Sequence, residues 1–200
     1  MNKFLIGLVL SLTASTFAYA AGDAAAGKEK SIACGACHGA DGNSTIGTFP
    51  KLAGQNAVYL IKQMKAIKSG ERSVPEMAGQ LDAKNEQDIE DLAVFYAGKK
   101  IIGGKTAADQ LELGRKIYRS GIATKQVAAC IACHGAKGQG LATAGFPALN
   151  GQHAAYTEKQ LMSFRTAVRS NDPNQMMRDI AARLSDVEIK AVSNYIQGLY

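Results

Sequence analysis

The chain has 200 residues, and its 23 Lys and Arg residues outnumber its 17 Asp and Glu residues, which gives a formal net charge of +6. The basic residues are dispersed and form no run of about five like charges, the pattern typical of nucleic-acid-binding tails, so we expect no nucleic-acid partner. A chain of this length also does not need the disulfide framework of a small secreted domain.

The first 20 residues predict a secretory signal peptide. Lys3 gives a basic start, residues 4–12 form a short apolar run, and Ala18 and Ala20 place small residues where signal peptidase cuts. The alternative is a retained membrane anchor, but the apolar run is shorter than the ~20 residues that a transmembrane helix needs. We therefore expect cleavage after Ala20, export, and a soluble mature chain, because no later segment of the sequence is long and apolar enough to span a bilayer.

All four cysteines fall in two copies of the C-x-x-C-H motif, which is the attachment signature of c-type haem. The copies are Cys34-Gly35-Ala36-Cys37-His38 and Cys130-Ile131-Ala132-Cys133-His134. Two thiols at this spacing can each form a thioether with the same porphyrin, and the histidine that follows can bind its iron. Two copies that use every cysteine predict two covalently attached haem c groups.

Other uses of these cysteines are weaker hypotheses. A zinc site would have to share ligands between distant motifs and would leave both histidines unexplained. A thioredoxin-like redox motif needs a βαβ context, which the sequence lacks. Because no cysteine is left over for a structural disulfide, we expect the core to be organised around two porphyrins.

Beyond the first haem motif, the first half reads in chain order as helices and loops. The segment Phe49–Gln55 has the pattern F-P-x-L-x-G-Q, and Met64 and Ile67 lie on an apolar stripe at helical spacing. Met77 falls in a loop, and Asn85–Asp88 opens a further helix. No segment alternates with a period of two residues, so the sequence predicts an all-α fold.

The second half repeats the first. Residues 146–152 repeat Phe49–Gln55 at an offset of 97, the haem motifs lie 96 apart, and the last helices lie 100 apart, with Ser185–Glu188 as a capping box. A pair of glycines, Gly103 and Gly104, suits a short linker. We expect two domains, residues 21–101 and 107–200, joined by a linker at 102–106, because a solenoid would need at least three repeats.

The methionines decide what fills the remaining axial position of each iron, because a thioether there closes the iron and raises its potential. Met64 and Met162 lie on amphipathic helices, where core packing explains them. Met77 lies in a loop, and the offset of 100 carries it onto Met177. Met77 and Met177 are therefore the predicted iron ligands, with the neighbouring Met176 left as the alternative in the second half.

Other residues are expected to have supporting roles. The carbonyl of Pro50 or Pro147 could orient the histidine of its own half, although an ordinary turn proline explains both equally well. Four residues matched between the halves could reach haem propionates or only pack in the core: Tyr59, Arg72, Tyr156 and Arg169. His153 is expected to have no counterpart in the first half and to lie at the surface or an interface.

Together the two haem motifs, the repeated F-P-x-L-x-G-Q segment and the loop methionines resemble the dihaem cytochrome c4 family over almost the whole mature chain. The segments Gly151–Tyr156 and Met176–Ala181 carry much of this similarity. The resemblance implies two tandem class I cytochrome c domains related by a pseudo-twofold, with the haems near their interface. It implies these attachment sites and axial ligands: Cys34, Cys37, His38 and Met77 for one haem, and Cys130, Cys133, His134 and Met177 for the other.

The resemblance also implies a periplasmic electron carrier and not an enzyme. Its partners would be redox proteins, such as a terminal oxidase or another respiratory membrane complex, reached by outer-sphere electron transfer, and some family members associate peripherally with the membrane. The alternatives are a dihaem peroxidase and a gas-binding haem protein, each of which needs one open iron. A methionine available in both halves favours the electron carrier.

Overall fold

The computed structural model describes residues 22–199, so the predicted signal peptide and its cleavage site lie outside the described residues. Within this range the regular structure is helical, and β-structure is limited to the isolated bridges Ile122–Val127 and Leu141–Phe146. No helix in the same range is long and apolar enough to cross a membrane. The prediction of an all-α fold is confirmed.

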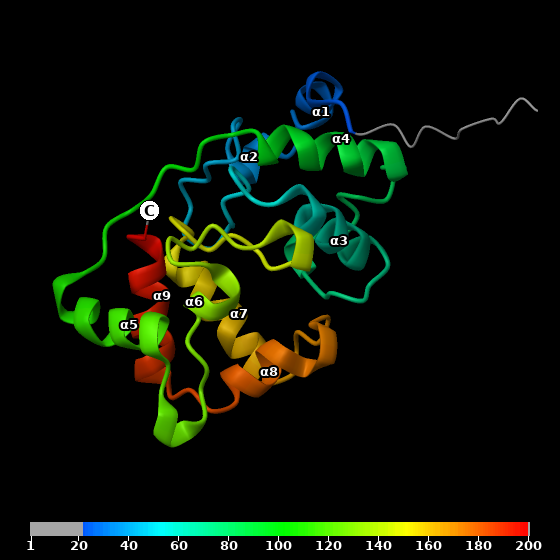
Figure 1. Cartoon of the computed structure of the whole chain (residues 1–200). Helices are drawn as coiled ribbons and strands as arrows, with labels where there is room; N and C mark the ends of the chain where they lie inside the picture. The colour runs from blue at the N-terminus through cyan, green and yellow to red at the C-terminus, as the bar shows by residue number, and fades with distance from the viewer. Residues whose placement is uncertain (1–21, 200) are drawn as a thin grey trace, which may run out of the picture.

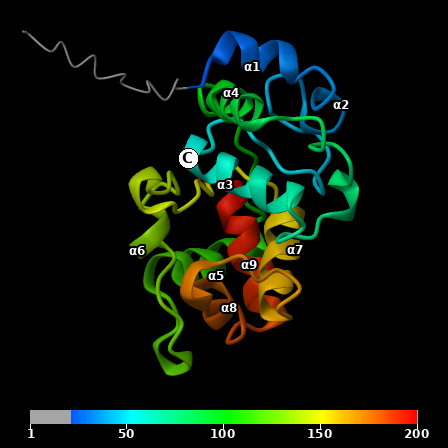
Figure 2. The same cartoon turned by 90° about the vertical axis from the view of Figure 1, so that its right-hand side faces the viewer.

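Each half is built on the same helical frame (Figures 1 and 2). The first half contains α1 (Ala24–Lys30), α2 (Gly35–His38), α3 (Ala57–Lys68), the 3-10 helix η1 (Pro75–Met77) and α4 (Glu86–Ala97). The matching elements of the second half are α5 (Ala108–Ser120), α6 (Ile131–His134), α7 (Ala154–Arg165), η4 (Pro173–Gln175) and α9 (Asp186–Gln197). Among the described residues, three elements occur only in the second half: η2 (Ala123–Lys125), η3 (Ala142–Ala144) and α8 (Met176–Ala181).

The predicted capping box at Ser185 is confirmed, and the predicted helix start at Asn85 is also a capping box. Asn85 Oδ1 accepts the backbone N–H of Asp88 at 2.9 Å, and the Asp88 carboxylate accepts the backbone N–H of Asn85 at the same distance. Ser185 and Glu188 make the same exchange at the start of α9. The caps satisfy backbone donors that have no partner inside a helix, so they fix where α4 and α9 begin.

The first and last helices of each half cross in close contact at a glycine. A Cβ atom on Gly27 of α1 would lie 2.1 Å from the carbonyl oxygen of Asp91 in α4. A Cβ atom on Gly114 of α5 would lie 2.3 Å from the carbonyl oxygen of Ala191 in α9. Both distances are far below van der Waals contact, so each crossing requires a residue without a side chain.

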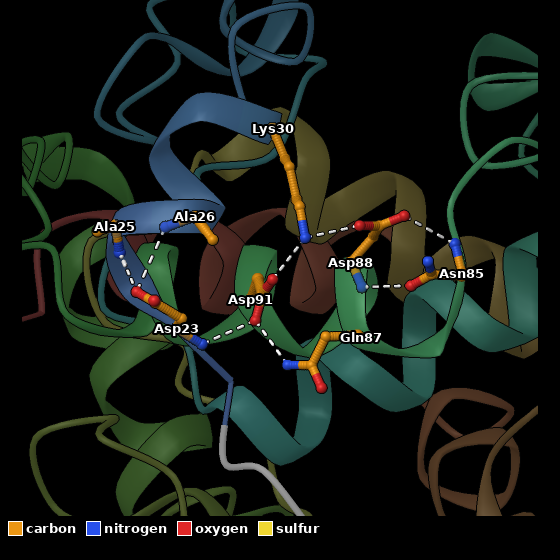
Figure 3. Close-up of polar contacts among 8 residues, drawn as sticks. All are labelled: Asp23, Ala25, Ala26, Lys30, Asn85, Gln87, Asp88 and Asp91. Carbon is orange, nitrogen blue, oxygen red and sulfur yellow. Dashed lines mark hydrogen bonds and ion pairs between the residues drawn. The ribbon is translucent and has the colours of Figure 1, made fainter.

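In the first half this crossing is also held by charge (Figure 3). Lys30 Nζ lies 2.6 Å from Asp88 and 2.5 Å from Asp91. The other oxygen of Asp91 accepts the backbone N–H of Asp23 at 2.7 Å and the side-chain amide of Gln87 at 2.8 Å. The hydrogen bond from Lys30, followed by those from Asp23 and Gln87, lowers the pKa of Asp91 to about 2.

Each half has its own apolar core. In the first half five buried residues form one apolar cluster: Leu60, Leu92, Ala93, Phe95 and Tyr96. The second core is larger and gathers ten buried residues: Ile117, Tyr118, Val127, Leu161, Leu184, Ile189, Val192, Tyr195, Ile196 and Leu199. Two separate cores on one repeated frame confirm the prediction of two domains in tandem.

The halves meet through residues that repeat at an offset of 97. Three pairs form a hydrogen-bonded network across the boundary: Tyr59 and Tyr156, Gln63 and Gln160, Arg72 and Arg169. Each guanidinium group donates to the tyrosine hydroxyl and the glutamine oxygen of the other half, at 2.9 and 3.0 Å respectively. This reciprocal exchange is what a pseudo-twofold axis between the halves produces.

The chain between α4 and α5 runs along the outside of both halves (Figure 1). The backbone N–H of Ile102 donates to the side chain of Asn43 in the first half at 2.8 Å. The backbone N–H of Gly104 donates to the carbonyl oxygen of Gln197 in the second half at 2.9 Å. The connection is therefore bound to each half.

Candidate haem sites

Each C-x-x-C-H motif forms one short helix. Cys34 lies at the N-cap of α2, and its carbonyl oxygen accepts the backbone N–H of His38 at 2.9 Å. Cys130 and His134 repeat this bond at 2.9 Å in α6. A helical turn places residues three apart on the same side, so both thiols of a motif can reach one porphyrin. All four thiols are free.

The two motif histidines are held by backbone carbonyls. His38 Nδ1 donates to the carbonyl oxygen of Pro50 at 2.9 Å, and His134 Nδ1 donates to that of Pro147 at the same distance. A carbonyl oxygen only accepts, so Nδ1 carries the proton and Nε2 keeps its lone pair for a metal. The proposed orienting role of the two prolines, which the sequence could not separate from an ordinary turn, is supported by this geometry.

Burial favours the neutral form of both imidazoles. His38 and His134 are each only 7% exposed. Burial lowers the pKa of both rings, and the smaller opposing effect of the bond to Pro50 or Pro147 does not reverse it. A neutral imidazole with one free nitrogen is the form that binds iron.

The donor set fits haem c better than zinc. Each motif offers two free thiols, one half-buried and one exposed, beside a neutral imidazole. Within residues 22–199, no three His, Cys, Asp or Glu side chains are close enough to hold a metal ion by themselves. A structural zinc site would need four such ligands together, so the zinc alternative is not supported.

Met77 ends η1 in the first half, and its side chain is half-buried. It lines a hollow together with Ile67, Val74 and Leu81. Glu76, the preceding residue, forms an ion pair with Lys159 of the second half at 2.8 Å. The segment that carries the predicted ligand is thus tied to the other half.

In the second half the structure separates the two candidate methionines. Met177 is half-buried and packs against the apolar core, whereas Met176 is 39% exposed. Both lie at the start of α8, where the side chain of Asp172 accepts the backbone N–H groups of Met177 and Arg178, each at 3.0 Å. These contacts favour Met177 as the inward-facing residue.

Sequence reasoning missed the role of Asp172. Its carboxylate also accepts a bond from Arg178 Nε at 2.7 Å. Burial alone would raise the pKa of Asp172, but the hydrogen bonds from Arg178 outweigh burial and lower it. The signal was the run of turn-forming residues 170–173 just before a helix, which is where a capping aspartate belongs.

His153 is an interface residue, as expected, because its Nε2 lies 2.8 Å from the carbonyl oxygen of Ser44 in the first half. The expectation that it has no counterpart was wrong. Asn56 occupies the matching position immediately before α3, and its side-chain amide donates to the carbonyl oxygen of Phe146 in the second half at 2.9 Å. The match is hidden in the sequence because the two residues differ in type while both bond across the boundary.

Two copies of one helical frame, each with a thioether-forming motif and a carbonyl-held histidine, define a c-type cytochrome with two haem sites. Comparisons with known proteins agree. The profile of the cytochrome c family matches residues 24–95 and 111–200. Cytochrome c4 of Pseudomonas aeruginosa is 49% identical over 201 residues, and that of Azotobacter vinelandii is 47% identical over 210 residues, each match covering 100% of both chains.

A solved structure extends this likeness to three dimensions. Reduced recombinant cytochrome c4 from Pseudomonas stutzeri aligns with a TM-score of 0.88 and 47% identity, covering 90% of this chain and 100% of that one. The chain belongs to the cytochrome c4 family, so it is a dihaem electron-transfer protein with covalently bound haem c. A more distant relative, the thiosulfate dehydrogenase electron acceptor of Stutzerimonas stutzeri, is 37% identical over 171 residues, or 82% of this chain and 77% of its own.

Proposed function

We propose that this protein is a periplasmic electron carrier of a respiratory chain, with His38 and Met77 ligating one iron and His134 and Met177 the other. The observation that carries the proposal is the matched pair of carbonyl-held histidines, each with Nε2 free beside two thiols. The half-buried positions of both methionines support their assignment as the second ligands.

The proposal includes the processing and division of the chain. A signal peptide cleaved after Ala20 would deliver the protein to the periplasm, where covalent haem attachment takes place. The mature chain would consist of domains 21–101 and 107–200 with a linker at 102–106. The profile matches, at 24–95 and 111–200, fall inside these limits.

When bound, each haem supplies an iron that gains and loses one electron. The residues of this chain hold it in place and limit how much must rearrange. The motif cysteines fix the porphyrin covalently, the carbonyls of Pro50 and Pro147 fix the histidine rings, and burial of His38 and His134 keeps water from those rings. A site with two protein ligands that stay bound suits electron transfer better than the activation of a small molecule.

The partners in this proposal are other redox proteins. The acceptor would be a terminal oxidase or a similar respiratory complex, reached by peripheral association with the membrane. The name of the Stutzerimonas stutzeri relative describes a protein that accepts electrons from a dehydrogenase, which supports a soluble or membrane dehydrogenase as the donor. A pull-down from solubilised membranes, with the ferric and the ferrous protein compared, identifies these partners.

The ligand assignment is tested by single substitutions. Met177→Ala should abolish the methionine-to-iron absorption band of one haem, and Met77→Ala that of the other. Met176→Ala is the matched control and should leave both bands intact, because its side chain lies more exposed. Loss of the band in Met176→Ala with retention in Met177→Ala would reverse the assignment.

A second test separates the carrier from a dihaem peroxidase or a gas-binding protein. Both of those need one iron with an open position, whereas this proposal closes both irons. Carbon monoxide added to the reduced protein at neutral pH should leave the haem spectrum unchanged. Ready binding at either haem would contradict the carrier function for that haem.

A further inference from the structure

One peptide group in the first half contacts both a haem-site histidine and the other half of the molecule. The carbonyl of Pro50 accepts the Nδ1–H of His38 at 2.9 Å. The N–H at the other end of the same peptide group belongs to Lys51 and donates to Oε1 of Gln152 at 2.9 Å. Gln152 lies in the second half, so the contact crosses the boundary.

The second half contains the same arrangement in reverse. The carbonyl of Pro147 accepts the Nδ1–H of His134 at 2.9 Å. The N–H of Ala148, at the other end of this peptide group, donates to Oε1 of Gln55 in the first half at 2.8 Å. The glutamine that closes the F-P-x-L-x-G-Q segment of each half therefore binds the peptide that holds the histidine of the other half.

Both glutamines are fixed by more than this one bond. Gln152 Nε2 donates to the carbonyl of Lys51, and Gln55 Nε2 donates to that of Ala148, both at 2.9 Å. Gln55 and Gln152 are 8% and 7% exposed. Each side-chain amide thus hydrogen-bonds to both the backbone N–H and the backbone carbonyl of one residue across the boundary. It cannot rotate without breaking two buried hydrogen bonds.

Such a chain of hydrogen bonds has an electronic consequence. A peptide whose N–H donates a bond becomes polarised, and its carbonyl becomes a better acceptor, an effect that is strengthened where water is excluded. A stronger bond at Nδ1–H makes the imidazole a more basic metal ligand through Nε2. A more basic ligand favours ferric over ferrous iron and lowers the midpoint potential.

We propose that Gln152 is a positioning residue for the haem site of the first half and Gln55 for that of the second, so that each half adjusts the redox potential of the other's iron. The connection runs from Gln152 through the Pro50–Lys51 peptide to His38, and from Gln55 through the Pro147–Ala148 peptide to His134. The proposal rests on the histidine ligation stated under the proposed function.

The test replaces each glutamine with methionine, which keeps the volume but removes the hydrogen bonds. In the holoprotein with Gln152→Met, the Nδ1–H proton signal of His38 in the ferrous state should move upfield, and the midpoint potential of the first haem should rise. Signals and potential of the second half should stay near their original values. Gln55→Met should produce the opposite pattern, with His134 and the second haem affected.

Tyr156→Phe is the control, because it removes another hydrogen bond across the same boundary without touching either histidine-bound peptide. It should leave both Nδ1–H signals in place. Gln152→Glu is the rescue variant, since a protonated carboxyl group can make the same two bonds to Lys51 and should restore the His38 signal. Shifts confined to the mutated half, equal shifts in both halves, or no shift would each overturn the proposal.

Two further measurements keep the test decisive. If Gln152→Met does not accumulate as a dihaem protein, Gln152→Ala removes the same bonds with a different packing defect. In the unmodified ferrous protein, a scalar coupling across the hydrogen bond should connect the Lys51 amide nitrogen to the Gln152 side-chain carbonyl, and its absence would overturn the proposal. Failure of histidine ligation itself would appear separately, as a missing axial-ligand signal in the unmodified protein.

Discussion

The two halves share one frame but fasten its central helix crossing differently. In the first half Lys30 bridges Asp88 and Asp91 (Figure 3). In the second half the positions that match Lys30 and Asp91 hold Ile117 and Ala191, which are uncharged and almost fully buried. The crossing glycines are the shared feature. The close approach of the two helices is thus required in both halves, whereas the side chains beside the crossing can be either charged or apolar.

The methionine segments differ in the same way. Met77 lies in a short 3-10 helix whose neighbour Glu76 makes an exposed ion pair with Lys159. Met177 lies in the first turn of a regular helix. The buried carboxylate of Asp172 accepts two backbone hydrogen bonds there, from Met177 and Arg178, and a third from the Arg178 side chain. The second segment is fastened within its own half, and the first depends partly on its neighbour.

The largest effect is expected at the shared feature. Gly27→Ala and Gly114→Ala should each lower the free energy of unfolding by about 3 kcal/mol, because the new Cβ would collide with backbone atoms that cannot move aside. Denaturant unfolding of the holoprotein measures this. Gly98→Ala is the control, since its Cβ would lie 3.5 Å from the nearest atom, an ordinary contact. If Gly114→Ala matched this control, the crossing would not be the common requirement.

A smaller effect should distinguish the methionine segments. Asp172→Ala should lower the free energy of unfolding by about 2 kcal/mol, because it removes a charged hydrogen bond with the Arg178 side chain and two hydrogen bonds from backbone N–H groups. The loss should appear as weaker methionine ligation of the second haem alone. The methionine-to-iron absorption band of that haem, recorded during mild denaturation, measures it. Glu76→Gln should change stability by about 0.5 kcal/mol or less, because an exposed ion pair contributes little. Equal effects of the two variants would remove the distinction.

The smallest effect is the pH dependence that Asp91 contributes to the first half. The folded-state pKa of Asp91 is about 2, below its ordinary value of 3.8, so its stabilisation is complete above about pH 4 and is lost as the pH falls toward 2. The stability difference between the original protein and Asp91→Asn should therefore shrink over this range. Hydrogen exchange of α1 and α4 measures it, with α5 and α9 as the internal reference. A difference that stays constant with pH would refute the role of charge.

The repeat made much of this structure predictable. The offset of 97 placed the F-P-x-L-x-G-Q segments, and the capping boxes at Asn85 and Ser185 located the starts of the last helices. These features depend on local chemistry, which a sequence displays directly. The family and its covalent haems followed from the two C-x-x-C-H motifs for the same reason.

The features that could not be predicted from the sequence depend on contacts between residues far apart in the chain. Gln55 and Gln152 were visible as repeated letters, but their bonds to the opposite peptide depend on how the halves pack. The match between Asn56 and His153 was missed because two different side chains do similar work in the interface. The pairing of Lys30 with Asp91 joins residues 61 positions apart, which no local pattern reveals.

The boundary network of Tyr59, Gln63 and Arg72 with their repeats has a consequence for how the halves stay together. A surface that binds a copy of itself is the surface of a symmetric homodimer. Here both copies belong to one chain, and the connection at residues 98–107 makes their association intramolecular. The effective concentration of each half near the other is then about millimolar whatever the concentration of the protein. A polar interface too weak to maintain a dimer in dilute solution can therefore hold two haem sites at a constant separation.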